Sequence, residues 1–357
     1  MSHAAASDIG CVPALPRPPE RPRAPRIPSA RRLRFALTAA AIAASFLSAG
    51  HAESVNVSFL YRLADFSGAV PYSDVQLSFD RHHDEIYAIV GNAVRVFNAA
   101  GMEIFHFDLD PGLGTIFGLA VEESGDLLLL TLEPLRPGAG AGWFITRCDY
   151  RGEPIERIGP TGLPPELESF RPNLLIARPE GLVLVSKAQV QAILIDRHAV
   201  FQKSWDLARL AGIKDEDRSG QEIFGFSIAP DGSMLFTIPT QFKVFVVAPS
   251  GGVKAFGRSG SAPGSFSVVA DVVADDHGRL FVADMGRYAV LVFDKNLEFV
   301  TEFGSGAEGA LELIRPAGLA IGDGGRLYVT QARDRGVAVF RIGSPFDGAG
   351  PQPGERP

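Results

Sequence analysis

The sequence predicts an all-β fold, a six-bladed β-propeller of four-stranded antiparallel blades, on three observations. A unit of 44 to 56 residues recurs six times along the chain. Within each unit, apolar and polar residues alternate over short runs that are rich in Val, Ile and Phe, as in strands with one buried face. Turn residues recur about every 8–12 positions, which leaves room for four strands per unit. Tandem four-stranded units of this length are typical of a propeller.

The repeats align on the residue that begins the first strand of each unit. The two clearest units contain "DVVADDHGRLFVADMGRYAVLVFD" and "RPAGLAIGDGGRLYV", in which Asp271 and Gly318 are 47 residues apart. Extending the alignment backwards gives six strand starts and six second-strand ends. The starts are Asp74, Gly118, Leu174, Gly225, Asp271 and Gly318, and the second strands end near Val90, Thr131, Lys187, Ile238, Asp284 and Gln331.

The two ends of the repeat region predict how the ring closes. The sixth unit stops after three strands, the last of them Val337 to Ile342. A surplus strand, Ser54 to Leu63, precedes the first unit. We expect it to complete the last blade, which would remove two free sheet edges. The stretch with helix-like composition, Ser204 to Asp217, lies between two units.

Three segments follow from composition: residues 1–52, the repeats at 53–343, and a Pro/Gly-rich tail at 344–357 that we expect to be disordered. The first is Pro/Arg-rich and ends in Arg31, Arg32 and Arg34, the apolar run Phe35–Ala49 and "SAGHAES". This is the pattern of a signal peptide cleaved after Ala52. A membrane anchor is the alternative, but the run is shorter than the roughly 20 residues of a spanning helix. We therefore expect a periplasmic or extracellular protein without a membrane anchor. The general secretory and twin-arginine routes both stay open.

Charge and cysteine content narrow the classes of partner. The segment 1–52 holds seven Arg and two acidic residues, which leaves 27 basic and 39 acidic residues in 53–357, a net charge of −12. A body this acidic is a poor binder of nucleic acid, because that affinity rests on Lys and Arg.

Cys148 is the one cysteine that remains after cleavage, so no internal disulfide can form. We expect its side chain in the core.

The sequence resembles the NHL repeat family. The stretches "FGRSGSAPGSF" and "RPAGLAIGDGGRLYV", together with "DVVADDHGRLFVADMGRYAVLVFD", carry the resemblance, which is strongest in the last two units. It implies a six-bladed propeller over about residues 54–343. It implies no single activity, because such rings serve as RNA binders, protein scaffolds and enzymes.

Two enzyme families with this architecture fit the sequence poorly. Amidating lyases that resemble this fold hold zinc with three inward histidines, and none of the aligned inner positions here is His. Lactonase-like propellers use a Glu, Asn and Asp set around calcium, and the Glu and paired Asn are missing from those positions. No G-x-S-x-G motif is present either.

The candidate site is the channel face, where first strands begin and second strands end. Asp74, Asp271 and Asp284 lie there and could hold a divalent cation, because hard cations prefer oxygen ligands. The alternative is that these carboxylates bind water or neighbouring backbone N–H groups. We expect no cofactor otherwise, and no catalytic residue is assigned.

Other residues on the same face predict binding. The loop from Thr131 to Asp149 is eight residues longer than its counterpart and carries Trp143, an aromatic anchor of the kind that binding surfaces use. A packed structural loop is the alternative. The remaining ligand-binding candidates are Lys187, Gln331, Arg333 and Arg335. We therefore expect a monomeric, secreted binding or scaffolding protein for a protein or cell-envelope partner, with a metal-assisted hydrolase or lyase of a small molecule as the alternative.

Overall fold

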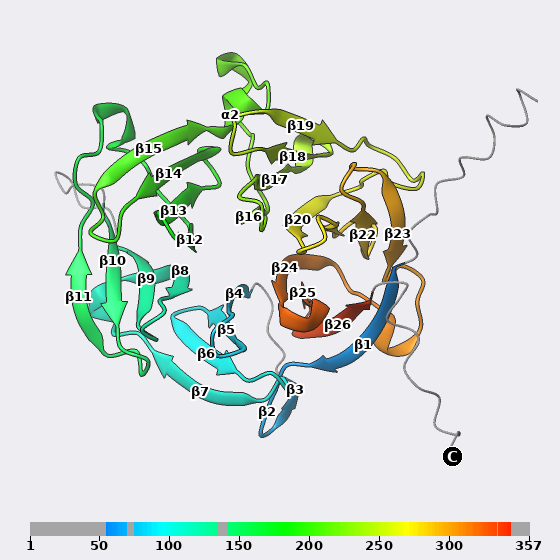
Figure 1. The fold of residues 1–357 in the computed structure, drawn as a ribbon, viewed down its shortest axis with the longest axis horizontal. Coiled ribbons are helices and arrows are strands. Elements are labelled where there is room, and N and C mark those ends of the chain that lie inside the picture. Colours follow the sequence, from blue (N-terminus) through cyan, green and yellow to red (C-terminus); the bar gives the residue numbers. More distant parts are fainter. Residues whose placement is uncertain (1–54, 70–74, 134–141, 334, 344–357) are drawn as a thin grey trace, which may run out of the picture. The chain divides into compact units, whose positions relative to one another are not determined.

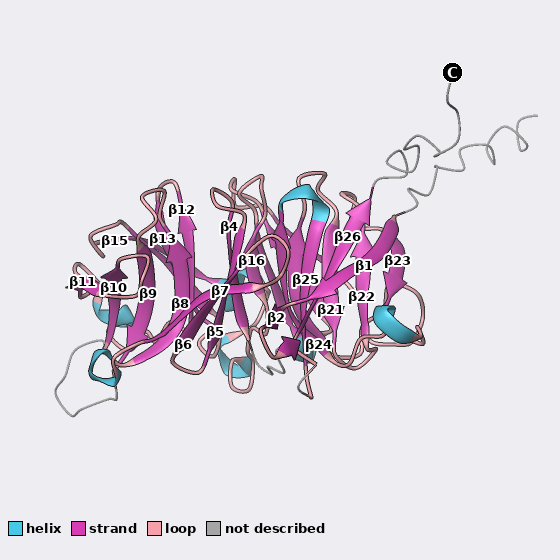
Figure 2. Cartoon of the chain, turned by 90° about the horizontal axis from the view of Figure 1, so that it is seen from below, coloured by secondary structure: helices cyan, strands magenta, loops and turns pink. Residues whose placement is uncertain are grey.

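The computed structural model describes residues 55–69, 75–133, 142–333 and 335–343. Within them the chain forms the predicted six-bladed propeller, with six four-stranded antiparallel sheets arranged in a ring (Figure 1). Each blade runs outward from its first strand, which lies nearest the centre of the ring. Seen from the side, turns join the strands at both rims (Figure 2).

The first three blades are consecutive in the chain. Blade 1 consists of β4 (Gln76–Asp80), β5 (Glu85–Val90), β6 (Ala93–Phe97) and β7 (Glu103–Asp108). Blade 2 consists of β8 (Thr115–Val121), β9 (Leu127–Leu132), β10 (Trp143–Cys148) and β11 (Pro154–Ile158). Blade 3 consists of β12 (Leu174–Arg178), β13 (Gly181–Ser186), β14 (Gln191–Ile195) and β15 (Phe201–Asp206).

The last three blades include the closing one. Blade 4 consists of β16 (Phe226–Ile228), β17 (Met234–Ile238), β18 (Lys243–Val247) and β19 (Val253–Phe256). Blade 5 consists of β20 (Val269–Ala274), β21 (Leu280–Asp284), β22 (Ala289–Phe293) and β23 (Phe299–Phe303). Blade 6 consists of β24 (Pro316–Gly322), β25 (Arg326–Gln331), β26 (Val337–Gly343) and β1 (Asn56–Arg62).

The pairing of β1 with β26 confirms the predicted closure. The two strands are antiparallel, with Asn56 opposite Gly343 and Arg62 opposite Ala338. Phe59 packs edge-on against Phe340, with the ring centroids 5.8 Å apart. The strand from the start of the repeat region therefore joins the last blade by both backbone pairing and side-chain packing.

Short elements connect the blades. A small hairpin of β2 (Ala64–Asp65) and β3 (Gly68–Ala69), which the sequence did not predict, follows β1. The helix-like stretch contains the end of β15, one helical turn α2 (Leu207–Leu210) and the 3₁₀ turn η3 (Asp215–Asp217). The other 3₁₀ turns are η1 (Pro111–Leu113), η2 (Pro165–Leu167), η4 (Pro239–Gln241), η5 (Gly309–Leu311) and η6 (Asp323–Gly325). None of the helices among the described residues is long and apolar enough to cross a membrane.

The core is divided among the blade interfaces. Six clusters of buried apolar side chains lie in the described residues, one between each pair of neighbouring blades. Central strands such as β13, β21 and β22 are buried along their whole length, because both of their faces meet a neighbouring sheet. Cys148 is fully buried in one cluster, as predicted, and burial raises the pKa of its thiol to about 11.

The turns between third and fourth strands repeat one device. A side-chain oxygen accepts hydrogen bonds from the backbone N–H groups two and four residues later, which fixes the turn without a helix or a longer loop. In the described part of the chain, four residues do this, in blades 1, 2, 3 and 5: Asn98, Asp149, Asp196 and Asp294.

Candidate functional site

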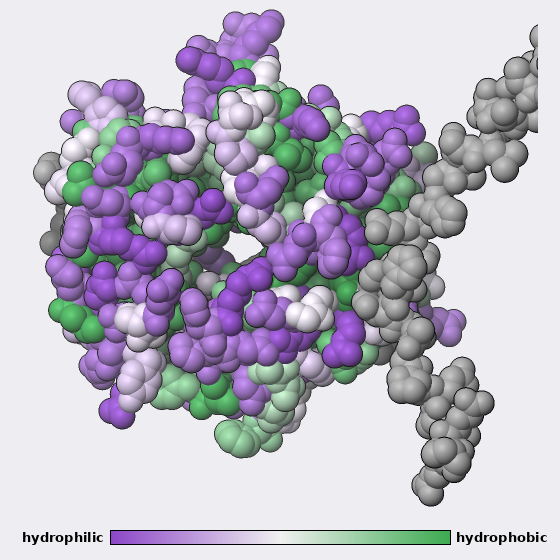
Figure 3. Space-filling view, viewed as in Figure 1, coloured by the Kyte–Doolittle hydropathy of each residue, from purple (hydrophilic) through white to green (hydrophobic). Residues whose placement is uncertain are grey.

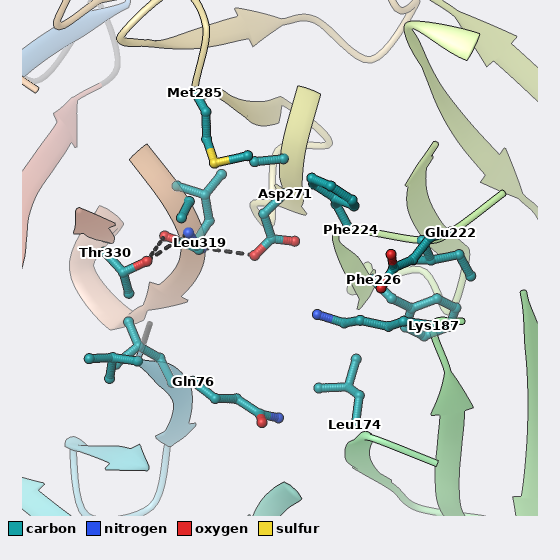
Figure 4. A pocket seen from close by; sticks show the side chains of 16 residues that line it. Gln76, Leu174, Lys187, Glu222, Phe224, Phe226, Asp271, Met285, Leu319 and Thr330 are labelled. Carbon is teal, nitrogen blue, oxygen red and sulfur yellow. Dashed lines mark hydrogen bonds between the residues drawn. The ribbon is translucent and has the colours of Figure 1, made fainter. Parts of the chain in front are cut away.

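A cavity of about 380 Å³ lies at the channel, on the face where first strands begin and second strands end. Figure 3 shows an opening at the centre of the ring, bordered mostly by hydrophilic residues. Five blades contribute to the cavity wall, and the described residues that line it include Gln76, Leu174, Lys187, Glu222, Phe224, Asp271, Met285, Leu319 and Thr330 (Figure 4).

Asp271 is a predicted site carboxylate that lines this cavity, and Glu222 is a second carboxylate on the same wall. It lies on β20 at a register shift between Val269 and Val272, and such bulges redirect a side chain. Its Oδ1 accepts a hydrogen bond of 2.8 Å from the N–H of Val272, and its Oδ2 accepts one of 2.8 Å from the N–H of Leu319 in blade 6. The carboxylate is therefore held in one orientation.

The neighbouring blade leaves room for this carboxylate. Gly225, directly before β16, lies so close to blade 5 that a Cβ on it would collide with Oδ1 and Cα of Asp271. Thr237 links Gly225 to β20 at this point. Its hydroxyl accepts a hydrogen bond from the N–H of Gly225 at 2.9 Å and donates one to the carbonyl of Ala270 at 2.7 Å. Blades 4 and 5 are thus joined immediately beside the cavity.

The environment of Asp271 opposes its ionisation. Burial raises the pKa of this carboxyl group to about 6, against the lowering effects of the Leu319 hydrogen bond, the charge of Lys187 and the Val272 hydrogen bond. Near neutral pH the group is mostly an anion that solvent does not fully stabilise. Such a group gains from a cation or a proton brought into the cavity.

Lys187 faces the same space from blade 3. Its backbone N–H donates to Oδ1 of Asn173 at 3.0 Å, and its carbonyl accepts from the N–H of Ile223 at 3.0 Å. The backbone is therefore fixed at the end of β13. The amino group reaches toward the middle of the cavity, on the side of Asp271 and Gln76 (Figure 4). No carboxylate of the described residues lies within ion-pair distance of Nζ.

The rest of the wall combines apolar groups, neutral polar groups and the exposed carboxylate of Glu222. Phe224, Met285 and Leu174 supply apolar surface, and Phe224 is 39% exposed although it is a large aromatic residue. Gln76 supplies an amide that points into the cavity (Figure 4). The sequence alignment missed three of these uncharged residues, although Phe224 directly precedes an aligned strand start, Met285 directly follows a second-strand end and Gln76 follows Asp74 by two residues.

Asp284 has a structural role, because backbone N–H groups occupy both oxygens of its carboxylate. The side chain is fully buried and accepts backbone hydrogen bonds from Ser267 at 2.7 Å, Val268 at 2.9 Å, and Gly286 and Arg287 at 3.0 Å each. It closes the loop between the second and third strands onto the segment that leads into β20. This is the hydrogen-bonded alternative that the sequence left open.

Gln331 occupies the equivalent place in blade 6. It is buried, and its Oε1 accepts a 2.8 Å hydrogen bond from the N–H of Ile314, in the segment that leads into β24. Its Nε2 has no hydrogen-bond partner among the described residues. Asp284 and Gln331 therefore fasten equivalent segments, and neither lines the cavity.

The expectation that Trp143 is an exposed anchor is corrected by its position. It is the first residue of β10, its side chain is 0% exposed, and it packs edge-on against Phe170 with ring centroids 6.5 Å apart. It belongs to the core between blades 2 and 3. The packed alternative is therefore the one the structure shows for this side chain, while most of the preceding loop, 134–141, lies outside the described residues.

The remaining candidates are not brought together with Asp271. Arg335 pairs with Glu312 at 3.5 Å, and Arg333 is an exposed turn residue with a positive φ of 57°. Neither lines the cavity. Asp74 lies outside the described residues. Among the residues that are described, no group of three or more His, Cys, Asp and Glu side chains is placed to hold a metal ion.

Comparisons with known proteins identify the fold. No family model matches the chain, and no curated protein matches its sequence. An auxiliary nutrient binding protein from Bacteroides thetaiotaomicron superposes with a TM-score of 0.56 at 12% identity, covering 81% of this chain and 77% of that one. A streptogramin B lyase gives 0.51 at 11% identity, covering 81% and 98%. A catalytically inactive virginiamycin B lyase from Staphylococcus aureus, with quinupristin, gives 0.50 at 13% identity, covering 81% and 99%. At these identities the likeness shows that the chain has the six-bladed β-propeller fold.

Proposed function

We propose that this protein is an exported NHL-type propeller that binds a ligand in the cavity of its channel face. The observation that carries the proposal is the cavity itself. It has a volume of about 380 Å³, a wall that is partly apolar, and polar groups that converge on it from different blades, namely Lys187, Asp271 and Gln76. A concave, mostly apolar pocket with a few fixed polar groups is the usual form of a small-molecule site.

The rigidity of the surroundings supports binding. The Asp271 carboxylate is held by two backbone N–H groups, and the backbone of Lys187 is held on both sides. Groups fixed in advance lose little entropy when a ligand arrives. The nutrient-binding name of the Bacteroides neighbour gives the fold a precedent for this role.

The same geometry favours a small ligand, or the end of a larger one, over a flat protein surface. The argument for a protein partner rested on Trp143, and that side chain is buried. A cavity of this volume instead encloses a small molecule or a terminal group presented by an envelope component. The net charge of −12 on residues 53–357 disfavours nucleic acid.

An envelope ligand agrees with export. The Arg-rich start, the apolar run Phe35–Ala49 and the small residues before Glu53 support cleavage after Ala52 and delivery to the periplasm or beyond. A binding protein in that compartment meets nutrients and cell-wall fragments rather than nucleic acid.

The test is retention of a ligand by the intact protein. Native mass spectrometry of protein isolated from envelope fractions should show a bound species that denaturation releases. The double variant Lys187→Ala, Phe224→Ala should lose that species, because both side chains line the cavity. Tyr150→Ala, an exposed aromatic on a turn of blade 2, is the control and should retain it. Equal retention by all three proteins would place the ligand elsewhere and overturn the proposal.

Catalysis at the same site is the second candidate. The pKa of about 6 for Asp271 suits a general base near neutral pH, and two of the structural neighbours are lyases. If this candidate is right, Asp271→Asn should abolish turnover of the bound species while leaving it bound. A metal-assisted form would need ligands besides Asp271, because the oxygens of Asp284 are occupied by backbone N–H groups. Metal analysis of the purified protein distinguishes the two forms.

A further inference from the structure

Two opposite charges face the channel cavity without meeting. Lys187 is close enough for its charge to act on Asp271, yet the two groups do not form an ion pair within 4.0 Å. Figure 4 shows the amino group and the carboxylate on opposite sides of open space. Partly buried charges are costly unless they are paired, so this gap favours a ligand that can pair with both.

A ligand with a single charge would fit this wall poorly. An anion would pair with Lys187 but would be repelled by Asp271, and also by Glu222 on the same wall. A cation would pair with the carboxylates of Asp271 and Glu222, but it would be repelled by Lys187 and would leave that ammonium group without a partner. Only a molecule that carries both charges satisfies the two sides at once.

The uncharged residues of the wall indicate what the rest of the ligand is like. Phe224, Met285 and Leu174 offer an apolar surface beside the two charges. The Gln76 amide, which can both donate and accept hydrogen bonds, points toward the same space (Figure 4). The volume of about 380 Å³ lies near the lower end of the range for small-molecule pockets.

We propose that the cavity binds a small zwitterion with an apolar side group, of the class of free apolar amino acids, with the ligand amine on Asp271 and the ligand carboxylate on Lys187. The inference rests on the proposed function, since it names the ligand of the same cavity. The amine takes up the negative charge that burial leaves under-solvated on Asp271, and the carboxylate takes up the positive charge of Lys187. The side group lies against Phe224 and Met285.

Calorimetric titration of the mature protein with the standard L-amino acids tests the inference. Apolar ones such as leucine, methionine and phenylalanine should bind. Two analogues of leucine separate the charges, because N-acetyl-leucine lacks the ammonium group and leucinamide lacks the carboxylate. Each should bind at least about tenfold more weakly, as expected for the loss of one charge-assisted contact. Dileucine, which spaces the two charges further apart, shows whether the ligand is a free amino acid or a short peptide.

Two variants assign each charge to its residue. Asp271→Asn should weaken leucine binding and remove the preference for leucine over N-acetyl-leucine. Lys187→Met should weaken leucine binding and remove the preference for leucine over leucinamide. Glu298→Gln, at an exposed position that does not line the cavity, is the control and should keep both preferences. Melting curves of all variants show whether they are folded, and a substitution that unfolds the protein is replaced by Asp271→Glu or Lys187→Gln.

Acidity provides an independent readout. Because the Asp271 carboxyl group titrates near pH 6, leucine should bind about tenfold more weakly at pH 5 than at pH 7 in the wild-type protein. The Asp271→Asn variant should lack this dependence. A pH-independent affinity in the wild type would contradict the assignment of the amine to Asp271.

Failure of this inference differs from failure of the proposed function. If no free amino acid binds, if dileucine binds more tightly than leucine, or if the capped analogues bind as well as leucine, the inference is overturned. If at the same time the native protein retains a species that Lys187→Ala, Phe224→Ala releases, the channel face is still a binding site. If nothing is retained either, both proposals are wrong.

Discussion

The carboxylate of Asp271 in blade 5 accepts a 2.8 Å hydrogen bond from the backbone N–H of Leu319 in blade 6. One side chain of the candidate site thus also joins the first strands of two blades. On its other side, the strand that carries Asp271 is held by the Thr237 hydroxyl of blade 4, through the carbonyl of Ala270. The stability of the ring and the chemistry of the cavity therefore depend on some of the same atoms.

Asp271 should make the stability of the protein depend on pH. Burial raises the pKa of its carboxyl group from 3.8 to about 6, so between these values the folded protein binds more protons than the unfolded chain. The free energy of unfolding should therefore fall as pH rises from about 4 to 6, by up to about 3 kcal/mol for this group. Urea unfolding at pH 4, 5, 6 and 7.5, compared between wild type and Asp271→Asn, measures it.

The variant lacks the titrating carboxyl group, so its stability should fall less than that of the wild type over this interval. Glu222→Gln serves as the matched control, because that residue is an exposed acid on the same cavity wall and should leave the wild-type dependence in place. If the free energy of unfolding depends on pH in the same way in the wild type and in Asp271→Asn, the pKa of the Asp271 carboxyl group is not raised.

Gly225→Ala should destabilise the ring by forcing blades 4 and 5 apart. The added Cβ would collide with the Asp271 side chain and backbone, and Gly225 has no positive φ that would add strain of its own. Overpacking of this kind costs about 1–3 kcal/mol. Gly252→Ala is a matched control, because a Cβ there comes no closer than 3.9 Å to a neighbour and its φ is likewise not positive. Similar denaturant midpoints for the two variants would contradict the close approach of the blades.

Most of the fold could be predicted from sequence, because the repeat places each strand relative to its neighbours. All six second-strand ends lie within one residue of the predicted positions. Because the last unit lacks a fourth strand, the surplus strand before the first unit could be predicted to supply it, and β1 does so. The β2–β3 hairpin was missed because its strands have two residues each, too few to show a period.

The site was predicted less well, since the repeat locates a face but not the direction of each side chain. Lys187 and Asp271 lie at aligned positions and do line the cavity, whereas Asp284 and Gln331 are also aligned but turn back to bond the backbone. Residues at aligned positions therefore have different roles: some line the cavity and others hold the backbone. Trp143 was misplaced because a long loop before it suggested exposure, while the side chain itself starts a buried strand.

Replacing Trp143 should affect stability and leave ligand binding intact in the folded protein. Removal of this fully buried side chain in Trp143→Ala leaves a cavity between blades 2 and 3 and should cost about 3–5 kcal/mol. Trp143→Phe should cost less, because it keeps an aromatic ring against Phe170 and removes an indole N–H that has no partner among the described residues. Chemical denaturation ranks the two variants, with the exposed Tyr150→Ala as the control. A change of less than about 1 kcal/mol for Trp143→Ala would contradict the burial.

The mature protein should begin at Glu53. The Arg-rich start, the apolar run and the small residues Gly50 and Ala52 are the features that signal peptidase requires. N-terminal sequencing of protein recovered from envelope and culture fractions measures the cleavage site. Replacing Ala52 with a large residue, as in Ala52→Phe, should slow processing, whereas Ala43→Phe within the apolar run should not. Recovery of only the full-length chain, in the cytoplasm, would show that the protein is not exported.

Deleting residues 54–63 should destabilise the ring far more than deleting residues 344–357. The first deletion removes β1, leaves the edge of β26 without its partner and exposes Phe340 where Phe59 had covered it. It also removes Leu63, which is 1% exposed and whose N–H donates to the carbonyl of Val337 at 3.0 Å. Buried side chains of this size contribute about 1.5–3 kcal/mol each, so the melting temperature should fall by at least about 10 °C, or the protein should aggregate through the free edge. The second deletion removes a segment that follows the last residue of β26 and should leave the melting temperature nearly unchanged. Equal melting temperatures for the two truncated proteins would mean that β1 does not hold the ring closed.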